Sequence, residues 1–369
     1  MKKFKITFII LFLIVAITLI FTMGGKSNDD NNASFTHITD IATINWDCLN
    51  INNEEFKLSS IFSNYSLLSL ENSKSSFIGE ISKIEYYDSL LLVLDKKHLS
   101  KIFVFNNTDG KFYRTIGKIG QGPGEYLSLN DFSIDKENNK VYLLCNKNKI
   151  YTYSLLGEFI EVKDLPFYAS QFEFQNERFY FNCDTRSTHQ LVITDKFIKI
   201  LSKHFENNLY KDAYREQIHH FQKRNEEIIF HRFLDNNIYK IDKNGEISVC
   251  YRLNLGNDAI CLSDISNFSQ EELKKELKRA TFYKYFTETN NYAFVVFFKS
   301  GIPYISIYDK ISKKSMTYKY ENSFNDYLND NIPILEYEHF SNGFAGVLPY
   351  NSSINDNIDD PNPTIINFY

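Results

Sequence analysis

The sequence predicts an all-β fold: a six-bladed β-propeller with four-stranded antiparallel blades, one short helical insertion and an N-terminal hydrophobic segment. A strand–turn–strand phrase recurs along the chain, and an internal repeat of this kind is the first feature to test in any sequence. Aromatic residues make up 16% of the chain, and they suit pleated, half-buried surfaces better than helices. A chain of 369 residues would often form two domains, but a propeller uses such a length in one ring.

The recurring phrase is a strand with alternating side chains, a turn marked by Gly or Asp, and a returning strand. Its copies begin at residues 102–105, 150–153, 190–193, 238–241 and 304–307. The first four copies are about 48, 40 and 48 positions apart, which is the period of a four-stranded propeller blade. The last step is longer, about 66 positions, and therefore requires an insertion.

The repeat predicts five blade units and a sixth that is composite. The five units cover about 84–116, 132–165, 172–201, 227–253 and 292–318. The sixth combines the C-terminal residues 334–369 with a strand from residues 38–58. A blade built from both chain ends closes the ring and removes exposed sheet edges.

The insertion, at about residues 263–286, contains a helix start signal. Ser269 is followed three residues later by Glu272, which is a capping box, and Phe268 and Leu273 occupy the hydrophobic staple positions. We interpret this helix as decoration of an inter-strand loop rather than as a partner-binding lid.

The N-terminus predicts export. Three lysines at positions 2, 3 and 5 precede the uncharged apolar residues 6–23. This pattern fits either a secretory signal sequence or a single membrane-spanning anchor, and both remain open. Positive charge before the span places the propeller on the extracytoplasmic side of the cell membrane, periplasmic or outer. The predicted organisation is signal or anchor at 1–26, polar linker at 27–37 and propeller at 38–369.

Charge and cysteine content narrow the function classes. The net charge is −5 and the basic residues are scattered, so nucleic acid is not an expected partner. The five cysteines show no CxxC spacing, and an odd number cannot all pair within the chain. A disulfide between Cys250 and Cys261 is conceivable in an exported domain, but unpaired thiols are the favoured interpretation.

The phrase GKIGQGPGEY at residues 117–126 is the most distinctive segment. It lacks the Gly-Lys-Ser/Thr ending of a phosphate-binding loop and does not fit GxGxxG. Its glycines and proline favour a conformational role, routing the chain from the outer strand of one blade to the inner strand of the next. The alternative is that it lines one mouth of the central channel and binds a ligand. The candidate ligand-binding residues are Gly120, Gly122, Pro123, Gly124, Glu125 and Tyr126.

This phrase, with the strand pair that precedes it, resembles the bacterial six-bladed β-propeller family of exported proteins, which are NHL-like in shape. The match runs through Ile116-Gly117, Gly120 and residues 122–126, and it extends over nearly everything after about residue 38. The resemblance implies an exported propeller. It implies no activity, because many members of this group have no assigned biochemistry. Members often carry a lipid-anchoring cysteine after the signal, and the first cysteine here is Cys48.

Other candidate clusters are weak. His219, His220, His231, Glu226 and Glu227 are suitable metal ligands or acid–base groups, but adjacent histidines on a strand point to opposite faces. We predict that the polar stretch 217–227 is a solvated loop or edge. The aspartates of residues 356–360 lack the alternation and closing Glu of a calcium loop. The sequence therefore predicts no metal site, no cofactor and no catalytic residue.

Two function classes follow. The first is a noncatalytic, membrane-associated binding scaffold, monomeric in its propeller, that engages a protein, peptide or glycan at the channel mouth. The alternative is a metal-assisted hydrolase or lyase with its site at the propeller channel. That enzyme would need several histidines or carboxylates from different blades to converge on the axis.

Overall fold

The computed structural model describes residues 43–54, 56–207, 219–265, 268–320, 339–340, 343–348 and 362–369. The chain divides into two compact units, Met1–Ala33 and Ser34–Tyr369, and every described residue belongs to the second. The predicted signal or anchor, the linker and the aspartates of residues 356–360 lie outside the described residues. In the part of the chain that is described, no helix is both long and apolar enough to cross a membrane.

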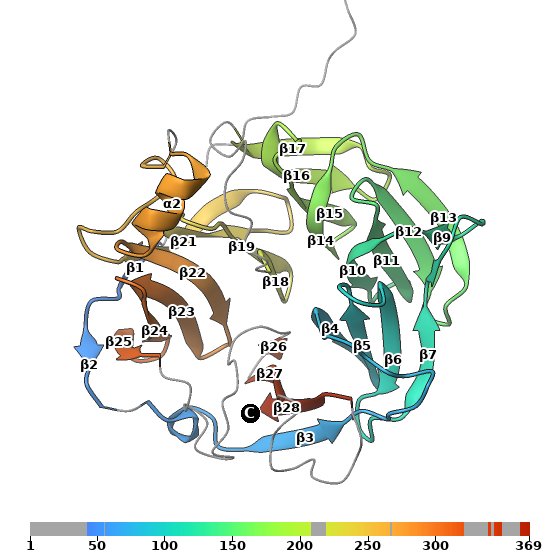
Figure 1. Ribbon diagram of the computed structural model, residues 1–369, viewed down its shortest axis with the longest axis horizontal. Helices are drawn as coiled ribbons and strands as arrows, with labels where there is room; N and C mark the ends of the chain where they lie inside the picture. The colour runs from blue at the N-terminus through green and yellow to red at the C-terminus, as the bar shows by residue number, and fades with distance from the viewer. Residues whose placement is uncertain are drawn as a thin grey trace, which may run out of the picture. The chain divides into compact units, whose positions relative to one another are not determined.

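The prediction of a six-bladed β-propeller is confirmed: six sheets surround a common axis, with the first strand of each blade innermost (Figure 1). Blade 1 holds β4 (Lys83–Tyr87), β5 (Leu90–Asp95), β6 (Lys101–Asn106) and β7 (Phe112–Ile116). Blade 2 holds β10 (Leu129–Asp135), β11 (Lys140–Cys145), β12 (Lys149–Ser154) and β13 (Phe159–Asp164). Blade 3 holds β14 (Ala169–Gln175), β15 (Arg178–Cys183), β16 (His189–Asp195) and β17 (Ile200–Glu206).

The remaining blades use both ends of the propeller sequence. Blade 4 holds β18 (Phe221–Arg224), β19 (Glu227–His231), β20 (Asn237–Ile241), β21 (Ile247–Asn254) and β1 (Ile44–Asp47). Blade 5 holds β22 (Thr281–Glu288), β23 (Tyr292–Lys299), β24 (Ile302–Asp309), β25 (Lys314–Lys319) and β2 (Ile51–Asn52). Blade 6 holds β26 (His339–Phe340), β27 (Gly343–Leu348), β28 (Thr364–Phe368) and β3 (Tyr65–Ser69).

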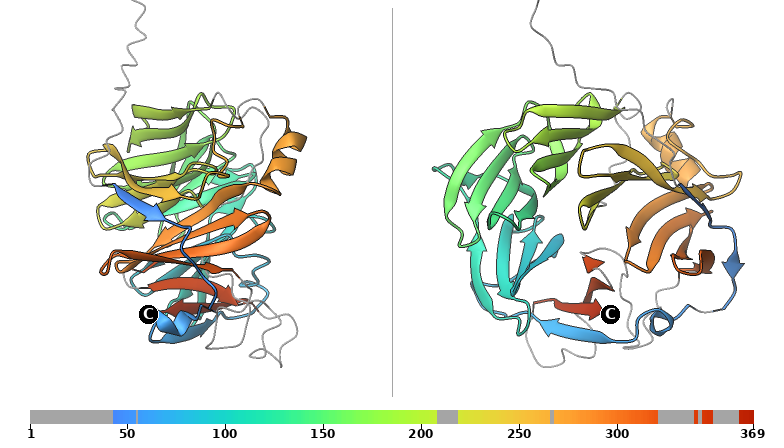
Figure 2. Two further views of the ribbon diagram at one scale, coloured as in Figure 1. Left: turned by 90° about the vertical axis from the view of Figure 1, so that its left-hand side faces the viewer. Right: turned by 180° about the vertical axis from the view of Figure 1, so that it is seen from behind.

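The N-terminal segment runs along the outside of blades 4 and 5 before it completes blade 6 (blue in Figure 2). β1 pairs in parallel with β21 and β2 pairs in parallel with β25, whereas β3 pairs antiparallel with β28. The prediction that residues 38–58 supply the closing strand is therefore wrong, because 65–69 supply it. The reason lies in Trp46 of β1, which is fully buried beside blade 5 and donates its indole N–H to Ser306 Oγ at 3.0 Å.

The predicted helix is present as α2 (Gln270–Leu277), at the outer edge of the ring (Figure 1). Both halves of the capping box form: Glu272 N–H donates to Ser269 Oγ at 3.3 Å, and Ser269 N–H donates to the Glu272 carboxylate at 2.8 Å. Leu273 anchors the helix in a buried cluster with Phe233 and Phe282. The insertion ends sooner than predicted, since residues 281–286 already belong to the inner strand β22.

The hydrophobic core lies between neighbouring blades rather than at the axis. One cluster joins Leu92 and Val104 of blade 1 to Phe132 and Leu143 of blade 2, and similar clusters fill the other junctions. Each fully buried side chain of this kind stabilises the fold by roughly 1.5–3 kcal/mol. A short 3-10 helix, η1 (Leu58–Ser60), belongs to the cluster at the junction of blades 5 and 6. All five cysteines are free in this structure.

Candidate functional site

Five charged side chains from four blades meet near the axis, and we call them the axial network. Its members are Lys83 and Glu85 on β4, Asp131 on β10, Glu173 on β14 and Lys223 on β18. Lys83 Nζ lies 2.6 Å from Glu173, 3.2 Å from Asp131 and 3.3 Å from Glu85. Lys223 Nζ lies 2.8 Å from Glu85 and 3.1 Å from Glu173, and it donates to Ser133 Oγ at 3.0 Å.

Burial makes the charges of the axial network strongly interdependent. Burial by itself would lower the pKa of Lys83, but the three carboxylates raise that pKa well above its usual value. Burial would raise the pKa of Glu173, but Lys223 and Lys83 outweigh it and bring that pKa to about 2. For Asp131 burial prevails, and its pKa is raised. The two lysines therefore remain ammonium ions, and Glu173 remains a carboxylate at neutral pH.

The axial network binds its own cations. Three carboxylates from different blades do converge, as an enzyme at the channel would require, but the group between them is the ammonium of Lys83. Among the described residues, no three His, Cys, Asp or Glu side chains are arranged to hold a metal ion. The geometry supports a structural role for these charges, since each one contacts another member of the network.

Sequence reasoning missed the network because it assigned residues 217–227 to a solvated loop or edge. Phe221–Arg224 form β18, which is the inner edge strand of its sheet and carries Lys223 to the axis. The predicted edge is therefore present, but the prediction of solvation is wrong for Lys223, whose side chain is 19% exposed. The strand is polar, and a polar stretch usually indicates a solvent-exposed segment. Here the charged side chains are paired with residues about 50 to 140 positions away, and the local sequence contains no sign of such pairing.

The histidines bind separate partners inside the propeller. His219 Nε2 donates to the Ser82 carbonyl and His220 Nδ1 donates to the His231 carbonyl, each at 2.8 Å. His231 Nδ1 is hydrogen-bonded to the Tyr283 hydroxyl at 2.6 Å. Burial lowers the pKa of His219 and of His220 to about 4, so both are neutral at pH 7. His220 and His231 are buried and His219 is half-buried, and each ring serves as a hydrogen-bonding group.

The GKIGQGPGEY phrase forms a loop that is held together by Glu125. Its β8 (Lys118–Ile119) pairs in parallel with β9 (Glu125–Tyr126). The Glu125 carboxylate accepts from the Gly122 N–H at 2.8 Å and contacts Lys118 Nζ at 2.6 Å. A Cβ at position 120 would lie 2.0 Å from Glu125 Oε2, so this carboxylate fits only because residue 120 is glycine. The loop connects β7 with β10 and thus performs the predicted routing from blade 1 to blade 2.

The loop lies against the outer strands of blade 2 and not at the channel mouth. Tyr153 on β12 donates its hydroxyl to the Gly124 carbonyl, and Phe159 on β13 packs directly on Gly124. Tyr126 is 1% exposed and donates its hydroxyl to the Ser100 carbonyl at 3.1 Å. In Figure 1, β9 accordingly lies beside β13 at the rim. These contacts do not fit the alternative position at the channel mouth, whereas ligand contact by the loop residues stays a prediction.

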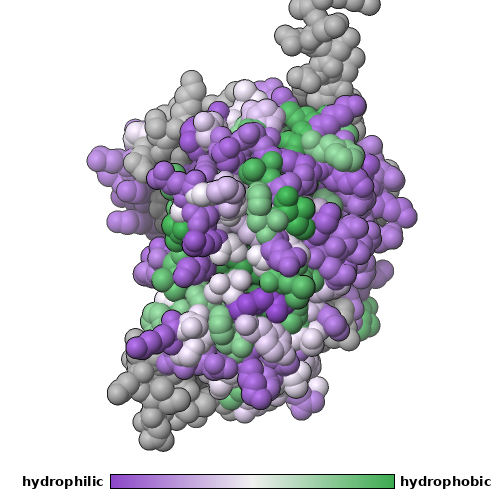
Figure 3. Space-filling view, turned by 90° about the vertical axis from the view of Figure 1, so that its right-hand side faces the viewer, coloured by the Kyte–Doolittle hydropathy of each residue, from purple (hydrophilic) through white to green (hydrophobic). Residues whose placement is uncertain are grey.

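Hydrophobic side chains gather on the outer face beside this loop (Figure 3). Leu127 is 65% exposed, and Phe159, Ile160 and Val162 of β13 are each 40–47% exposed. β13 is the last strand of its sheet among the described residues, whereas β21 and β25 are each covered by an N-terminal strand. The structure therefore places the loop that contains the six candidate residues beside an apolar outer surface.

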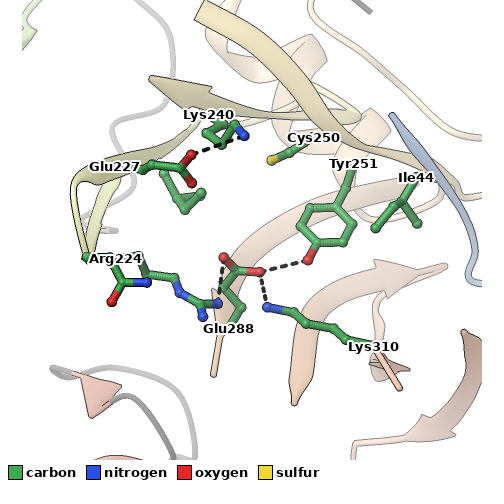
Figure 4. Close-up of a pocket in the computed structure, with 10 residues that line it drawn as sticks. Ile44, Arg224, Glu227, Lys240, Cys250, Tyr251, Glu288 and Lys310 are labelled. Carbon is green, nitrogen blue, oxygen red and sulfur yellow. Dashed lines mark hydrogen bonds and ion pairs between the residues drawn. The ribbon is translucent and has the colours of Figure 1, made fainter. Parts of the chain in front are cut away.

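A pocket of about 240 Å³ opens at the junction of blades 4 and 5 (Figure 4), and we call it the blade 4–5 pocket. It is lined by Ile44, Arg224, Asn225, Glu227, Ile229, Lys240, Cys250, Tyr251, Glu288 and Lys310. The lining comes from β1 and β18–β21 of blade 4, from the turn between β18 and β19, and from the end of β22 and the residue that follows β24 in blade 5. No sequence motif links these positions, so only the fold brings them together.

Glu288 is the centre of the blade 4–5 pocket (Figure 4). Its Oε1 lies 2.9 Å from Arg224 Nη1, and its Oε2 lies 2.5 Å from Lys310 Nζ and 2.7 Å from the Tyr251 hydroxyl. Burial, aided by Glu288, raises the pKa of Tyr251, so this phenol stays protonated and donates to Glu288. At the rim, Lys240 Nζ lies 3.2 Å from Glu227. The polar side chains of this pocket are thus held in fixed positions by contacts across two blades.

Comparison with known proteins agrees with this architecture. A family model described as 6-bladed beta-propeller matches residues 27–344. The chain belongs to this family. A search of curated protein sequences returned no match.

Two solved structures share the fold of this six-bladed propeller. A candidate exported protein from Bacteroides fragilis is similar with a TM-score of 0.69 at 19% identity, over 89% of this chain and 99% of that one. A member of the duf4221 family from Bacteroides vulgatus has a TM-score of 0.53 at 10% identity, over 84% and 96% of the two chains. At these identities the similarity concerns the fold.

Proposed function

We propose that this six-bladed propeller is a noncatalytic binding scaffold on the extracytoplasmic side of the cell membrane, periplasmic or outer. The observation that carries the proposal is the contrast between the axial network and the blade 4–5 pocket. The axial carboxylates are bound by lysines of the same chain. The pocket keeps about 240 Å³ of open space beside polar side chains that are already held in position.

The chemistry of the pocket favours binding over catalysis. A catalytic acid, base or nucleophile needs a pKa suited to proton transfer or attack near neutral pH. Burial raises the pKa of the Cys250 thiol, so it remains the protonated, weakly nucleophilic form. Burial also raises the pKa of the Tyr251 phenol. These groups are suited to hydrogen bonding with a bound molecule.

The proposed location rests on the N-terminal segment. The lysines at positions 2, 3 and 5 and the uncharged residues 6–23 favour export, with attachment of the chain through this segment. The fold similarity to a candidate exported protein is consistent with that location. The scattered basic residues and the net charge of −5 favour a partner other than nucleic acid. We expect a monomeric propeller whose ligand is a protein, peptide or glycan.

The loop at the rim is a second contact region within the same proposal. Gly120, Gly122, Pro123, Gly124, Glu125 and Tyr126 lie beside the exposed apolar side chains of β13, where a protein or peptide would meet them. Tyr126 itself is buried, so its part is to hold the loop. Pro123 is exposed, and Glu125 and the three glycines are half-buried.

The proposal is tested by ligand screening with a variant that fills the pocket. The full chain, in detergent, is screened by thermal shift against glycan and peptide panels, and the hits are measured by calorimetry. We expect Ile44→Trp, in the pocket lining on β1, to abolish binding of a pocket ligand. Ile51→Trp on β2, 38% exposed and outside the pocket lining, is the matched control and should bind normally. Turnover of any hit, followed by product analysis, would contradict the noncatalytic proposal.

A further inference from the structure

The blade 4–5 pocket carries more positive than negative charge. Its lining includes three cationic side chains, Arg224, Lys240 and Lys310, but two carboxylates, Glu227 and Glu288. The rim pair of Lys240 and Glu227 is mutually neutralised at 3.2 Å, with side chains that are 38% and 42% exposed. The excess charge therefore belongs to the deeper group around Glu288.

Two cations share one carboxylate in that deeper group. Arg224 and Lys310 contact opposite oxygens of Glu288, and the side chains of both are 19% exposed. Within the described ranges, no other carboxylate lies within ion-pair distance of Arg224 or Lys310. A partly buried charge without a partner is costly, so an additional anion at this position is stabilising. Burial lowers the pKa of Lys310 despite the contact with Glu288, which agrees with a positive charge that Glu288 balances only in part.

The hydrogen-bonding capacity of the same two cations exceeds their contacts in the described part of the chain. Lys310 Nζ donates to Glu288 and, at 2.7 Å, to the Thr289 carbonyl, and an ammonium has three N–H groups. Arg224 Nη1 contacts Glu288 and donates to the Thr289 carbonyl at 2.8 Å, and Nη2 donates to Asn290 Oδ1 at 2.6 Å. A guanidinium has five N–H groups, so donors remain for a ligand with acceptor oxygens.

The rest of the pocket limits the size and nature of the ligand. The side chains of Ile44 and Ile229 supply apolar wall, and Ile229 is 3% exposed. A volume of about 240 Å³ is below the range of roughly 300–1,000 Å³ that is usual for drug-sized ligands. The space suits one small molecule with an anionic end and an apolar or ring-shaped body.

We infer that the blade 4–5 pocket binds a small carboxylate, with the carboxylate group at Arg224 and Lys310 and the body of the molecule against Ile44 and Ile229. Glu288 holds the two cations apart and in place, and the ligand supplies the second negative charge. This inference rests on the proposed binding function and names the ligand class for it. The carboxylate belongs either to a free organic acid, such as a sugar acid, or to the C-terminus of a peptide.

The test uses the full chain and matched pairs of probes in calorimetry. D-glucuronate is compared with D-glucose, and the tripeptide Ala-Ala-Ala is compared with its C-terminal amide. We expect at least one carboxylate probe to bind about tenfold or more tightly than its neutral counterpart. Binding of glucuronate would identify a free acid as the ligand type, and binding of the tripeptide acid would identify a peptide terminus.

Variants then connect the effect to the pocket. Lys310→Met removes the excess charge and should weaken carboxylate binding about tenfold or more, whereas Lys310→Arg keeps the charge and should retain most of it. Lys314→Met, an exposed position on β25, is the matched control. Circular dichroism and the melting temperature check that each variant is folded.

The outcomes separate the inference from the proposed function. Equal binding of each neutral probe and its carboxylate, abolished by Ile44→Trp, would overturn the carboxylate inference and leave a binding pocket. If no carboxylate probe binds but a glycan or peptide from the panels binds outside the pocket, the carboxylate inference fails and the proposed binding function stands. If no molecule from any panel binds, both fail. Equal loss of binding in Lys310→Met and Lys310→Arg would also contradict the role of the charge.

Discussion

Lys83 on β4 and Glu173 on β14 meet near the axis of the propeller, with Nζ 2.6 Å from Oε1, although 90 residues separate them in the chain. They belong to blades 1 and 3, which are not neighbours in the ring. Their side chains are 10% and 6% exposed. The contact therefore ties together two blades that are separated by blade 2, where apolar packing between adjacent blades does not reach.

Breaking this contact should destabilise the propeller. Glu173→Gln leaves Lys83 and Lys223 with too little negative charge in a buried site, and removal of one partner from a buried ion pair costs about 3–5 kcal/mol. The free energy of unfolding from urea titrations measures the effect. The matched control is Glu80→Gln, which breaks the exposed pair with Lys97 at 2.8 Å and should cost about 1 kcal/mol or less. Similar losses for the two variants would contradict a structural role for the axial network.

Stability should fall in mild acid because of the half-buried His219 and the buried His220. The pKa of His219 and of His220 is lowered to about 4 in the folded state, against about 6.5 in the unfolded chain. A lowered folded pKa contributes stability that is complete above the unfolded pKa and is lost as pH falls towards the folded pKa. The free energy of unfolding should therefore decrease between pH 6.5 and pH 4. His219→Gln and His220→Gln should each make this decrease smaller, whereas His98→Gln, whose side chain is 52% exposed, should not.

The closing strand of blade 6 should be essential to the ring. β28 lies between β27 and β3, and all five of its residues are buried. Deleting residues 365–369 exposes the edges of β27 and β3 and removes Ile365, Ile366 and Phe368 from the core. We expect a large decrease in melting temperature or loss of the folded state by near-UV circular dichroism. An unchanged melting temperature would show that blade 6 closes in another way.

The glycine at position 120 should be required by Glu125. Gly120→Ala places a Cβ in the space of Glu125 Oε2 and displaces this carboxylate from the Gly122 N–H. We expect a small decrease in the free energy of unfolding, because the Glu125 carboxylate can move aside but then loses its hydrogen bond from the Gly122 N–H. Because the two residues are in contact, the effect of Gly120→Ala should shrink in a Glu125→Ala background, and a double-mutant cycle measures this coupling. Strict additivity would contradict the proposed clash.

Local signals in the sequence predicted the elements that depend on local physics. The strand–turn–strand repeat predicted the blades because strand propensity and turn residues act within a few positions of the chain. The capping box at Ser269 and Glu272 predicted α2 because both of its hydrogen bonds form within one helical turn. Where the local pattern was polar, as in β18, the same reasoning placed an inner strand in solvent.

The sequence by itself therefore determined the propeller class, the number of blades, the helix and the routing role of the GKIGQGPGEY loop. Only the tertiary structure decided that residues 44–52 add edge strands to blades 4 and 5, that the loop lies at the outer rim, and that Arg224, Glu288 and Lys310 form one pocket. The physical reason is distance along the chain. Ion pairs between blades leave no periodic pattern in either of the two segments that form them. The same holds for a sheet edge that pairs with a strand from a distant part of the chain.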